Sequence, residues 1–435
     1  MESGAEWGRR TRHACKVDRQ ECLSYSDGRL TESPLRLGRR SRGETSNIGR
    51  SHAAQNACAE AHPMARATHA SPLQFCGGSV ILALLGLLFL TPLAFATEFV
   101  KGPYLQEMTA HSVTVMWESD KVAPAMVEYG PTGKLGRTIL TRGRPALAGI
   151  PIDGLEADTV YYYRVAEGDA VSSTYTFRTL PEKGQFTFAV YGGPLRPKEQ
   201  VKTLLVMALK NPSFVIHLGN IVSDGAAGKQ WGPQFFDQAG PLMARVPFFT
   251  VAGEQEKESA LYYNYLGGHG GRPWYSFDCA DAHFVMLDSC VDLGTESEQC
   301  KWLVKDLGEK QARWKIVAMN QPIDYSQNDA QKALRGTLAR CGADLVLGGR
   351  NGNREGEQSV TAAIGSAAVV SGLIEPDGTA PATDAVMSFC TVEIDGDKLT
   401  VREFNDDGRL LSGFAVTKDG TRAAGGSVAN KNRRE

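Results

Sequence analysis

Between residues 97 and 180, hydrophobic and polar side chains alternate in short runs, the pattern of β-strands that bury one face. The clearest runs are residues 112–117, 125–129 and 160–165. Glycine and proline turns, such as the one at residues 129–133, separate them at the spacing of a β-sandwich. The pattern therefore predicts an all-β sandwich domain over residues 97–180.

Beyond a linker at residues 181–184, continuous apolar runs alternate with segments of helical periodicity. Buried strands are predicted at residues 186–191, 214–218, 247–251, 282–287, 314–319 and 345–347. Helices are predicted at 198–210, with Val201, Leu204, Leu205 and Ala208 on one face, and near 298–310 and 330–340. This rhythm predicts an α/β layered domain over residues 185–420. The loops that follow strand ends converge in such folds, so function is sought there.

The chain before residue 97 differs in composition and in hydrophobic pattern. Residues 1–63 are rich in arginine and lack apolar runs, which predicts a disordered or non-native extension and makes Met64 the expected start. Residues 64–96 join a cationic start to an apolar run that ends in Ala-Phe-Ala, the pattern of a signal peptide cleaved after Ala96. An uncleaved membrane anchor is the alternative, although the run is short for a hydrocarbon core of about 30 Å. Export to the periplasm or the cell exterior, in a bacterial envelope, is predicted.

Composition narrows the class of protein. The 435 residues are 42% hydrophobic and 22% charged, which excludes collagen-like, coiled-coil and wholly disordered chains. A net charge of −2 argues against a nucleic-acid partner, because gripping phosphates requires a basic excess. Residues 421–435 are rich in glycine, alanine and charge, and are predicted to be a disordered tail.

Five of the nine cysteines lie after the expected cleavage point. They form no Cys-x-x-Cys pair, so a zinc ribbon is not expected. An oxidising compartment would permit a disulfide, for which Cys290 and Cys300 are the candidate pair.

Two sets of motifs carry a family resemblance. The first set resembles the fibronectin type III-like N-terminal domain of purple acid phosphatases: Gly102-Pro103-Tyr104-Leu105-Gln106, Trp117, Glu128-Tyr129-Gly130 and Thr176-Phe177-Arg178-Thr179. The second resembles the calcineurin-like metallophosphoesterase domain of the same proteins: Phe214-Val215-Ile216-His217-Leu218-Gly219, Trp274-Tyr275-Ser276-Phe277-Asp278, Val285-Met286-Leu287-Asp288-Ser289 and Ala312-Arg313-Trp314-Lys315. The resemblance implies an αββα layered fold. It also implies hydrolysis of phosphoric esters at a dinuclear iron, zinc or manganese centre, with metals roughly 3.5 to 4 Å apart.

In that family five loops supply the metal ligands and catalytic groups, and this chain departs from each. The loops read Gly192-Gly193 for Gly-Asp, Gly219-Asn220 for Gly-Asp, Gly253-Glu254-Gln255-Glu256 for Gly-Asn-His-Glu, Asn320-Gln321-Pro322 for His-x-Pro, and Gly349-Arg350-Asn351-Gly352 for Gly-His-x-His. The seven family positions therefore hold Gly193, Asn220, Glu254, Gln255, Asn320, Arg350 and Gly352. None keeps its family identity, so no catalytic residue, metal or cofactor is expected.

The replacements are chemically unsuited to metals. A neutral amide cannot replace a bridging carboxylate, and a protonated guanidinium has no lone pair to donate. Four histidines follow residue 96, and none lies in the ligand loops: His111, His217, His269 and His283. A relocated metal site built from His217, His269, Asp224 and Glu254 is the alternative; a strand histidine is more often a hydrogen-bonded core residue.

Two further hypotheses concern the charged residues in the region where these loops converge. Glu254 and Arg350 occupy positions that bind one metal in the family, so an ion pair between them would replace that metal. Alternatively both face solvent, where a pair contributes only about 0 to 1 kcal/mol. Arginine forks also match phosphate oxygens, so Arg196, Arg350 and Arg354 are candidates for binding a phosphate-like anion without hydrolysis.

Three functions from different classes follow. The first is an exported pseudoenzyme that uses a metallophosphoesterase scaffold for binding or structure, with an unknown protein or envelope partner. The second is an active metal-dependent phosphomonoesterase, which the scaffold suggests and the loops contradict. The third is an envelope adhesion or assembly module that binds its partner through the sandwich. The loops favour the first function. Attachment to a membrane is expected only through an uncleaved signal segment.

Overall fold

A computed structural model describes residues 13–15, 22–26, 29–31, 97–141, 146–193, 197–256, 258–267, 272–321, 329–351, 358–364, 368–371, 388–418 and 422–424. The chain forms two compact units, Met1–Leu87 and Leu88–Glu435. In the first unit three short strands pair in order: β1 (His13–Cys15), β2 (Cys22–Ser26) and β3 (Arg29–Thr31). The sequence between β2 and β3 is Asp-Gly, a common two-residue hairpin loop. The expectation of disorder is therefore wrong for these strands.

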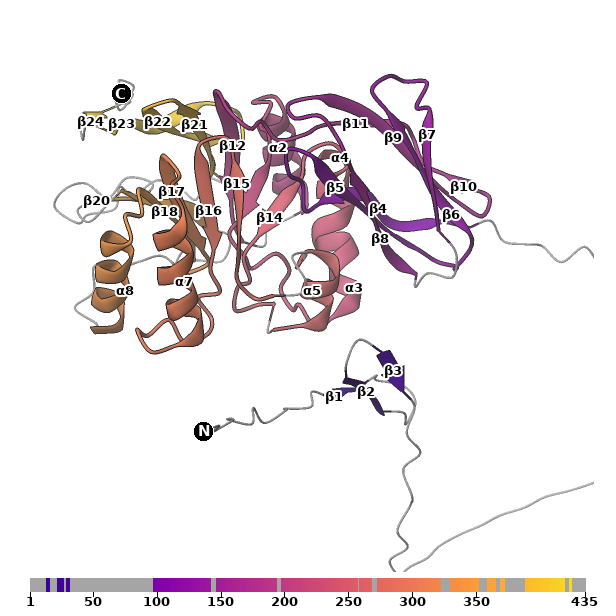
Figure 1. Ribbon diagram of the computed structural model, residues 1–435, viewed down its shortest axis with the longest axis horizontal. Helices are drawn as coiled ribbons and strands as arrows, with labels where there is room; N and C mark the ends of the chain where they lie inside the picture. The colour runs from indigo at the N-terminus through magenta and orange to yellow at the C-terminus, as the bar shows by residue number, and fades with distance from the viewer. Residues whose placement is uncertain are drawn as a thin grey trace, which may run out of the picture. The chain divides into compact units, whose positions relative to one another are not determined.

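The second unit begins with two antiparallel sheets that face each other as a sandwich (Figure 1). One sheet holds β4 (Phe99–Gln106), β5 (Ser112–Ser119) and β8 (Leu147–Asp153). The other holds β6 (Ala125–Gly130), β7 (Arg137–Thr141), β9 (Val160–Glu167), β10 (Ala170–Val171) and β11 (Tyr175–Arg178). Burial alternates along β5 and β9, as predicted, so that Trp117 and Tyr163 enter one shared core.

Two larger sheets follow, and their parallel strands alternate with helices. The first has the order β14 (Phe248–Thr250), β13 (Val215–His217), β12 (Phe186–Tyr191), β21 (Ser388–Asp395), β22 (Lys398–Asn405), β23 (Leu410–Thr417) and β24 (Arg422–Ala424). The second has the order β15 (Tyr275–Cys279), β16 (Ala282–Met286), β17 (Trp314–Met319), β18 (Leu345–Asn351), β19 (Gln358–Ile364) and β20 (Ala368–Ser371). Strands β12 to β14 are mutually parallel, as are β16 to β18, so their following loops emerge at common edges.

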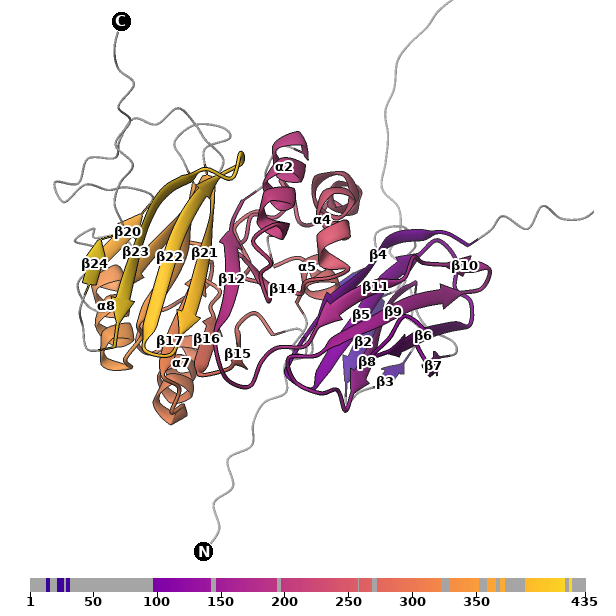
Figure 2. The same cartoon turned by 90° about the horizontal axis from the view of Figure 1, so that it is seen from above.

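Helices cover the outer faces of these sheets (Figure 2). Over the first lie α2 (Pro197–Ala208), α3 (Gly228–Trp231), the π-helical turn η1 (Gly232–Phe236), α4 (Asp237–Met243) and α5 (Ala260–Tyr265). Over the second lie α7 (Glu298–Glu309) and α8 (Asp329–Arg340). Between the sheets, Phe249 stacks on Phe277 with ring centroids 3.7 Å apart. The described residues therefore form helix, sheet, sheet and helix layers in the second unit.

Three expectations need correction. Helix α2 forms, and of its predicted face Leu204 is buried, but Val201, Leu205 and Ala208 are exposed. The helix packs through Gln200, Thr203, Leu204 and Met207, a face displaced by one residue from the predicted one. The cysteines after residue 96 are free, and Cys290 is exposed while Cys300 is buried, so the proposed disulfide is wrong. In the tail, β24 pairs with β23, so disorder is wrong for residues 422–424; the remaining tail residues lie outside the described structure.

The sandwich packs tightly against the α/β layers. The Tyr104 hydroxyl donates to the carbonyl of Tyr265 at 2.9 Å, and the Tyr163 hydroxyl donates to that of Ala244 at 2.8 Å. Both tyrosines are fully buried. The Lys101 ammonium lies 4.7 Å from the ring centroid of Tyr265. Among the described residues, no helix is both long and apolar enough to cross a bilayer.

Candidate functional site

Loops from four strand ends meet at the carboxyl edges of the two sheets. They are residues 192–193 after β12, 218–221 after β13, 252–256 after β14 and 320–321 after β17. The Gly193 amide donates to the Gly219 carbonyl at 2.9 Å. A β-carbon on Gly219 would lie 2.8 Å from the Gly253 nitrogen and 2.9 Å from Nδ2 of Asn320. Only glycine permits this approach, so the sequence places all four loops in one cluster.

The turn at the centre of this cluster has a special backbone. Gly219 and Asn220 have φ angles of +82° and +55°, two successive left-handed residues. Glycine adopts this region freely, and asparagine tolerates it better than most side chains. Nδ1 of His217 accepts a hydrogen bond from the Gly219 amide at 3.2 Å, which holds the start of the turn.

Glu256 ties the second loop to the third. Its carboxylate accepts main-chain hydrogen bonds from Asn220 at 2.8 Å, Ile221 at 2.7 Å and Gly253 at 2.7 Å. The residue is fully buried, and this burial raises the pKa of its carboxyl to about 7, against the opposing effect of the main-chain donors. Glu256, the last residue of the Gly253-Glu254-Gln255-Glu256 loop, therefore holds the second and third loops together. The sequence did not predict this role.

The side-chain amides of Asn220 and Asn320, where the family resemblance predicts metal ligands, bind neighbouring loops. Nδ2 of Asn320 donates to the Leu218 carbonyl at 2.6 Å. Oδ1 of Asn220 accepts a hydrogen bond from the main-chain N–H of Gln255 at 3.1 Å. Both asparagines are buried, at 2% and 5% exposure for Asn220 and Asn320. Their polar atoms therefore serve contacts within the protein.

Glu254 lies at the exposed margin of the cluster. Its Oε1 accepts a hydrogen bond from Nε2 of Gln321 at 2.9 Å, and the Gln321 amide donates to Oγ of Ser289 at 2.8 Å. The main chain of Arg350 lies in β18 opposite Ser359. The side chain of Arg350, together with Arg196, Gly352 and Arg354, lies outside the described residues, so the ion pair with Glu254 and the anion site stay predictions.

The described histidines are bound within the protein. His217 is fully buried against the Tyr191 ring, with centroids 4.4 Å apart, and burial lowers its pKa to about 3. His283 bridges Asp278 at 2.6 Å and Asp306 at 2.8 Å. These two carboxylates raise the pKa of its imidazole despite the opposing effect of burial.

The third described histidine, His111, contacts the Leu155 carbonyl and Glu182 in the sandwich. His269 lies outside the described residues, so the relocated metal site stays a prediction. Asp224 accepts from the Ala226 amide in a local turn.

The described residues do not fit a dinuclear metal centre. Such a centre needs a bridging carboxylate and several imidazole or carboxylate donors with free lone pairs. Across the part of the chain that the structure describes, no three His, Cys, Asp or Glu side chains gather in a metal-binding arrangement. Oδ1 of Asn220 accepts a hydrogen bond from the main-chain amide of Gln255, and Oε1 of Glu254 accepts one from the Gln321 side chain.

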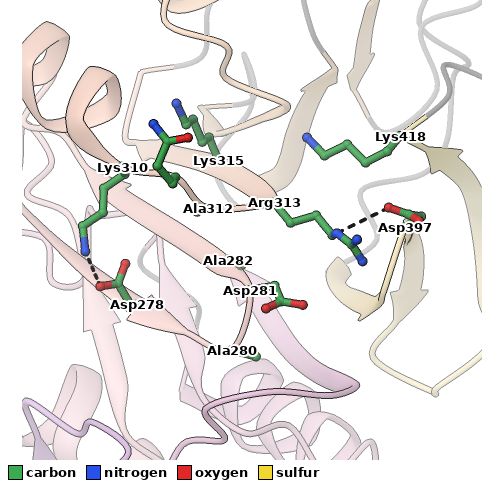
Figure 3. A pocket seen from close by; sticks show the side chains of 11 residues that line it. Asp278, Ala280, Asp281, Ala282, Lys310, Ala312, Arg313, Lys315, Asp397 and Lys418 are labelled. Atoms are coloured by element: carbon green, nitrogen blue, oxygen red, sulfur yellow. Dashed lines mark hydrogen bonds and ion pairs between the residues drawn. The ribbon is translucent and has the colours of Figure 1, made fainter.

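A cavity of about 980 Å³ opens far from this cluster, at the amino ends of β16 and β17 (Figure 3). Three of its four cationic side chains form ion pairs: Lys310 with Asp278, Arg313 with Asp397 at 3.4 Å, and Lys418 with Asp344 at 2.6 Å. The fourth, Lys315, donates to the main-chain carbonyl of Leu307. The cavity therefore offers no unpaired charge from these three residues, and it lies outside the loops that sequence reasoning indicated.

Comparison with known proteins finds similarity to purple acid phosphatases. No family model matches it. Purple acid phosphatase 18 of Arabidopsis thaliana is 28% identical over 274 residues, which are 54% of this chain and 61% of the relative. Purple acid phosphatase 21 of the same plant is 29% identical over 231 residues, 46% of this chain and 51% of the relative. The chain thus spans less than two thirds of the length of these relatives.

Solved structures share the fold. Purple acid phosphatase PPD1 from yellow lupin (Lupinus luteus) seeds superimposes with a TM-score of 0.58 at 15% identity, covering 73% of this chain and 74% of that one. PhoD superimposes with a TM-score of 0.57 at 12% identity, covering 78% and 95%. The chain is thus similar in sequence to plant purple acid phosphatases over about half of its length, and it shares the fold of the solved purple acid phosphatase PPD1 and of PhoD.

Proposed function

We propose that this protein is a catalytically inactive, purple acid phosphatase-like scaffold with a binding or structural role. The observation that supports this most is the hydrogen bond from Asn320 to the Leu218 carbonyl. A residue at a family ligand position here closes the crevice by holding one loop against another. Fold similarity alone does not establish catalytic activity, because activity depends on the side chains present at the site.

The second candidate is an active metal-dependent phosphomonoesterase. Its only support is the likeness to proteins named phosphatases, which covers about half of this chain. Two-metal hydrolysis requires ligands that activate a water and neutralise the phosphate. The four loops of the cluster offer neutral amides, one buried carboxylate that accepts three main-chain hydrogen bonds, and one exposed carboxylate. This chemistry favours the inactive scaffold.

Export and partner binding complete the proposal. The apolar run before residue 97 supports secretion into a bacterial envelope. The sandwich, which we propose to be fibronectin type III-like, would then face an envelope protein or matrix partner.

Hydrolysis of p-nitrophenyl phosphate tests the proposal. The purified protein is assayed from acid to neutral pH after incubation with iron, zinc or manganese, beside a variant with Asn220→Ala. We expect no metal-dependent turnover above the blank. Turnover that requires metal and falls in the Asn220→Ala variant would overturn the proposal; turnover that is unchanged in that variant comes from a contaminating phosphatase.

A further inference from the structure

A buried histidine lies between two carboxylates beside the cavity at the amino ends of β16 and β17. His283, on β16, is only 1% exposed. Its Nδ1 lies 2.6 Å from Oδ1 of Asp278, the residue opposite it on β15, and its Nε2 lies 2.8 Å from Oδ2 of Asp306 on α7. A neutral imidazole has one N–H and one lone pair, so it can donate to only one carboxylate. Hydrogen bonds to both carboxylates therefore require the imidazolium.

The two carboxylates differ in their surroundings. The Asp306 side chain is 17% exposed, and its Oδ1 also accepts a hydrogen bond from Oγ of Ser276 at 3.1 Å. The Asp278 side chain is 53% exposed and also pairs with Lys310. Asp278 and Lys310 both line the cavity, where their ion pair is seen in Figure 3. Asp278 is therefore the carboxylate that can turn to solvent, whereas Asp306 is held from a second side.

Two lysines also approach this group from neighbouring elements. Lys310 follows the end of α7 and reaches Asp278. Lys315 is the register partner of His283 on β17, and its Nζ donates to the Leu307 carbonyl of α7 at 2.6 Å. Both cations act against a further positive charge on the ring, and the two carboxylates in contact with the ring act in its favour.

The balance of these effects favours the charged ring. Burial opposes the charge on His283, yet the hydrogen bonds to Asp278 and Asp306 raise the pKa of the imidazole above its ordinary value. The hydrogen bond from His283 is in turn the main cause that lowers the pKa of Asp278 to about 2. Asp278 is therefore ionised wherever His283 titrates.

We propose that His283 is a proton-controlled latch, which holds Asp278 against β16 while the ring is protonated and releases Asp278 with Lys310 into the cavity when the ring loses its proton. The proton leaves Nδ1 for the solvent. The lone pair that remains on Nδ1 would face the Asp278 carboxylate at 2.6 Å, which is a repulsive contact. Nε2 keeps its proton and its hydrogen bond to Asp306.

The latch acts on the alkaline side of neutrality. The folded protein binds this proton more tightly than the unfolded chain, in which a histidine has a pKa of about 6.5. The contribution of the latch to stability is therefore complete below about pH 6.5 and is lost as the pH rises through the folded-state pKa. Because the latch lies far from the loop cluster, the inference does not depend on whether that cluster is catalytic.

A titration of the full-length protein by nuclear magnetic resonance tests the proposal, between about pH 5.5 and 9. The ring signals of His283 are assigned from their loss in His283→Gln, and the main-chain amide signals of Asp278 and Lys310 report the release. Asp278→Asn removes one carboxylate that contacts the ring. Asp281→Asn is the matched control, because Asp281 lines the same cavity while the ring contacts Asp278 and Asp306.

We expect a pKa above about 6.5 for His283 and the same midpoint for the amide signals of Asp278 and Lys310. The transition of these amides should vanish in His283→Gln. Asp278→Asn should lower the pKa of His283 by at least about 1, and Asp281→Asn by less than about 0.5. A His283 pKa at or below about 6.5 in wild type would overturn the proposal, as would amides that do not follow the ring. Equal lowering by the two aspartate variants would also overturn it, since a diffuse field would then act instead of the contact.

Discussion

Nδ2 of Asn320 lies 2.6 Å from the main-chain oxygen of Leu218, so the end of β17 is hydrogen-bonded to the end of β13. Both atoms are buried in the cluster where four loops meet. A histidine is expected at this position from the family resemblance, with its lone pair directed at a metal. The amide of Asn320 instead donates to the main chain of the protein, so this position joins two of the loops.

Replacement of Asn320 should measure this contact. Asn320→Ala removes the donor and leaves the buried Leu218 carbonyl without it, which should lower the free energy of unfolding by about 1 to 3 kcal/mol. Urea denaturation monitored by tryptophan fluorescence gives this value. Gln321→Ala, on the exposed neighbour, should cost less than about 0.5 kcal/mol. Equal costs for the two variants would contradict a structural role for Asn320.

Glu256 should be more important for stability than the exposed Glu254. Glu256→Gln replaces one acceptor oxygen with an NH₂ group that faces main-chain donors, so we expect a loss of about 1 to 3 kcal/mol in the free energy of unfolding. Glu254→Gln makes the same chemical change at the crevice margin and should be nearly neutral. Denaturant unfolding at pH 8 compares the pair. A neutral Glu256→Gln would show that the three main-chain bonds do not hold the loops.

His217 should make the fold sensitive to acid. Its pKa is lowered to about 3 in the folded protein by burial, against about 6.5 in the unfolded chain. Between these values the unfolded state binds more protons, so stability falls as the pH decreases from about 6.5 to 3, by up to about 1.4 kcal/mol per pH unit. His217→Asn keeps an acceptor for the Gly219 amide but does not titrate.

The test is the free energy of unfolding of wild type and of His217→Asn at several pH values between 4 and 7. Glu256 titrates in the same range with the opposite effect, but it is present in both proteins, so its contribution cancels when the two free energies are subtracted. Glu256 has a raised pKa, so its own contribution to stability declines as the pH rises from about 4.5 to 7. Identical pH slopes for wild type and His217→Asn would contradict the burial of a neutral imidazole.

The sandwich and the α/β layers should unfold together. Tyr163→Phe removes the hydroxyl that donates to the Ala244 carbonyl, and should reduce the free energy of unfolding by about 1 kcal/mol. Tyr162→Phe, on the opposite face of β9, serves as the control. Calorimetry should show one transition for all three proteins. Two separated transitions in wild type would contradict an integrated interface.

Much of the fold could be read from hydrophobic patterning. The runs at residues 186–191 and 314–319 coincide with β12 and β17, because strands buried on both faces are continuous apolar segments. The buried face of α2 could not be read in this way. Its most apolar stripe contains Val201 and Leu205, yet polar Gln200 and Thr203 are buried, since the position of the sheet decides which face packs.

The site was less predictable than the fold. Parallel strands implied that their following loops converge, and Gly219 indeed approaches both Gly253 and Asn320. The family resemblance indicated which residues depart from a metal site. It could not show where their side chains point, because hydrogen bonds such as Asn220 to the Gln255 amide depend on side-chain conformation. The role of Glu256 was missed for the same reason.

Metal content tests the central claim most directly. The protein, purified without a metal-affinity step, is analysed for iron, zinc and manganese by inductively coupled plasma mass spectrometry. The account predicts less than about a tenth of an equivalent per chain, because the described loops lack the donors of a two-metal centre. Close to about two equivalents per chain would contradict it, since a dinuclear site would then be present.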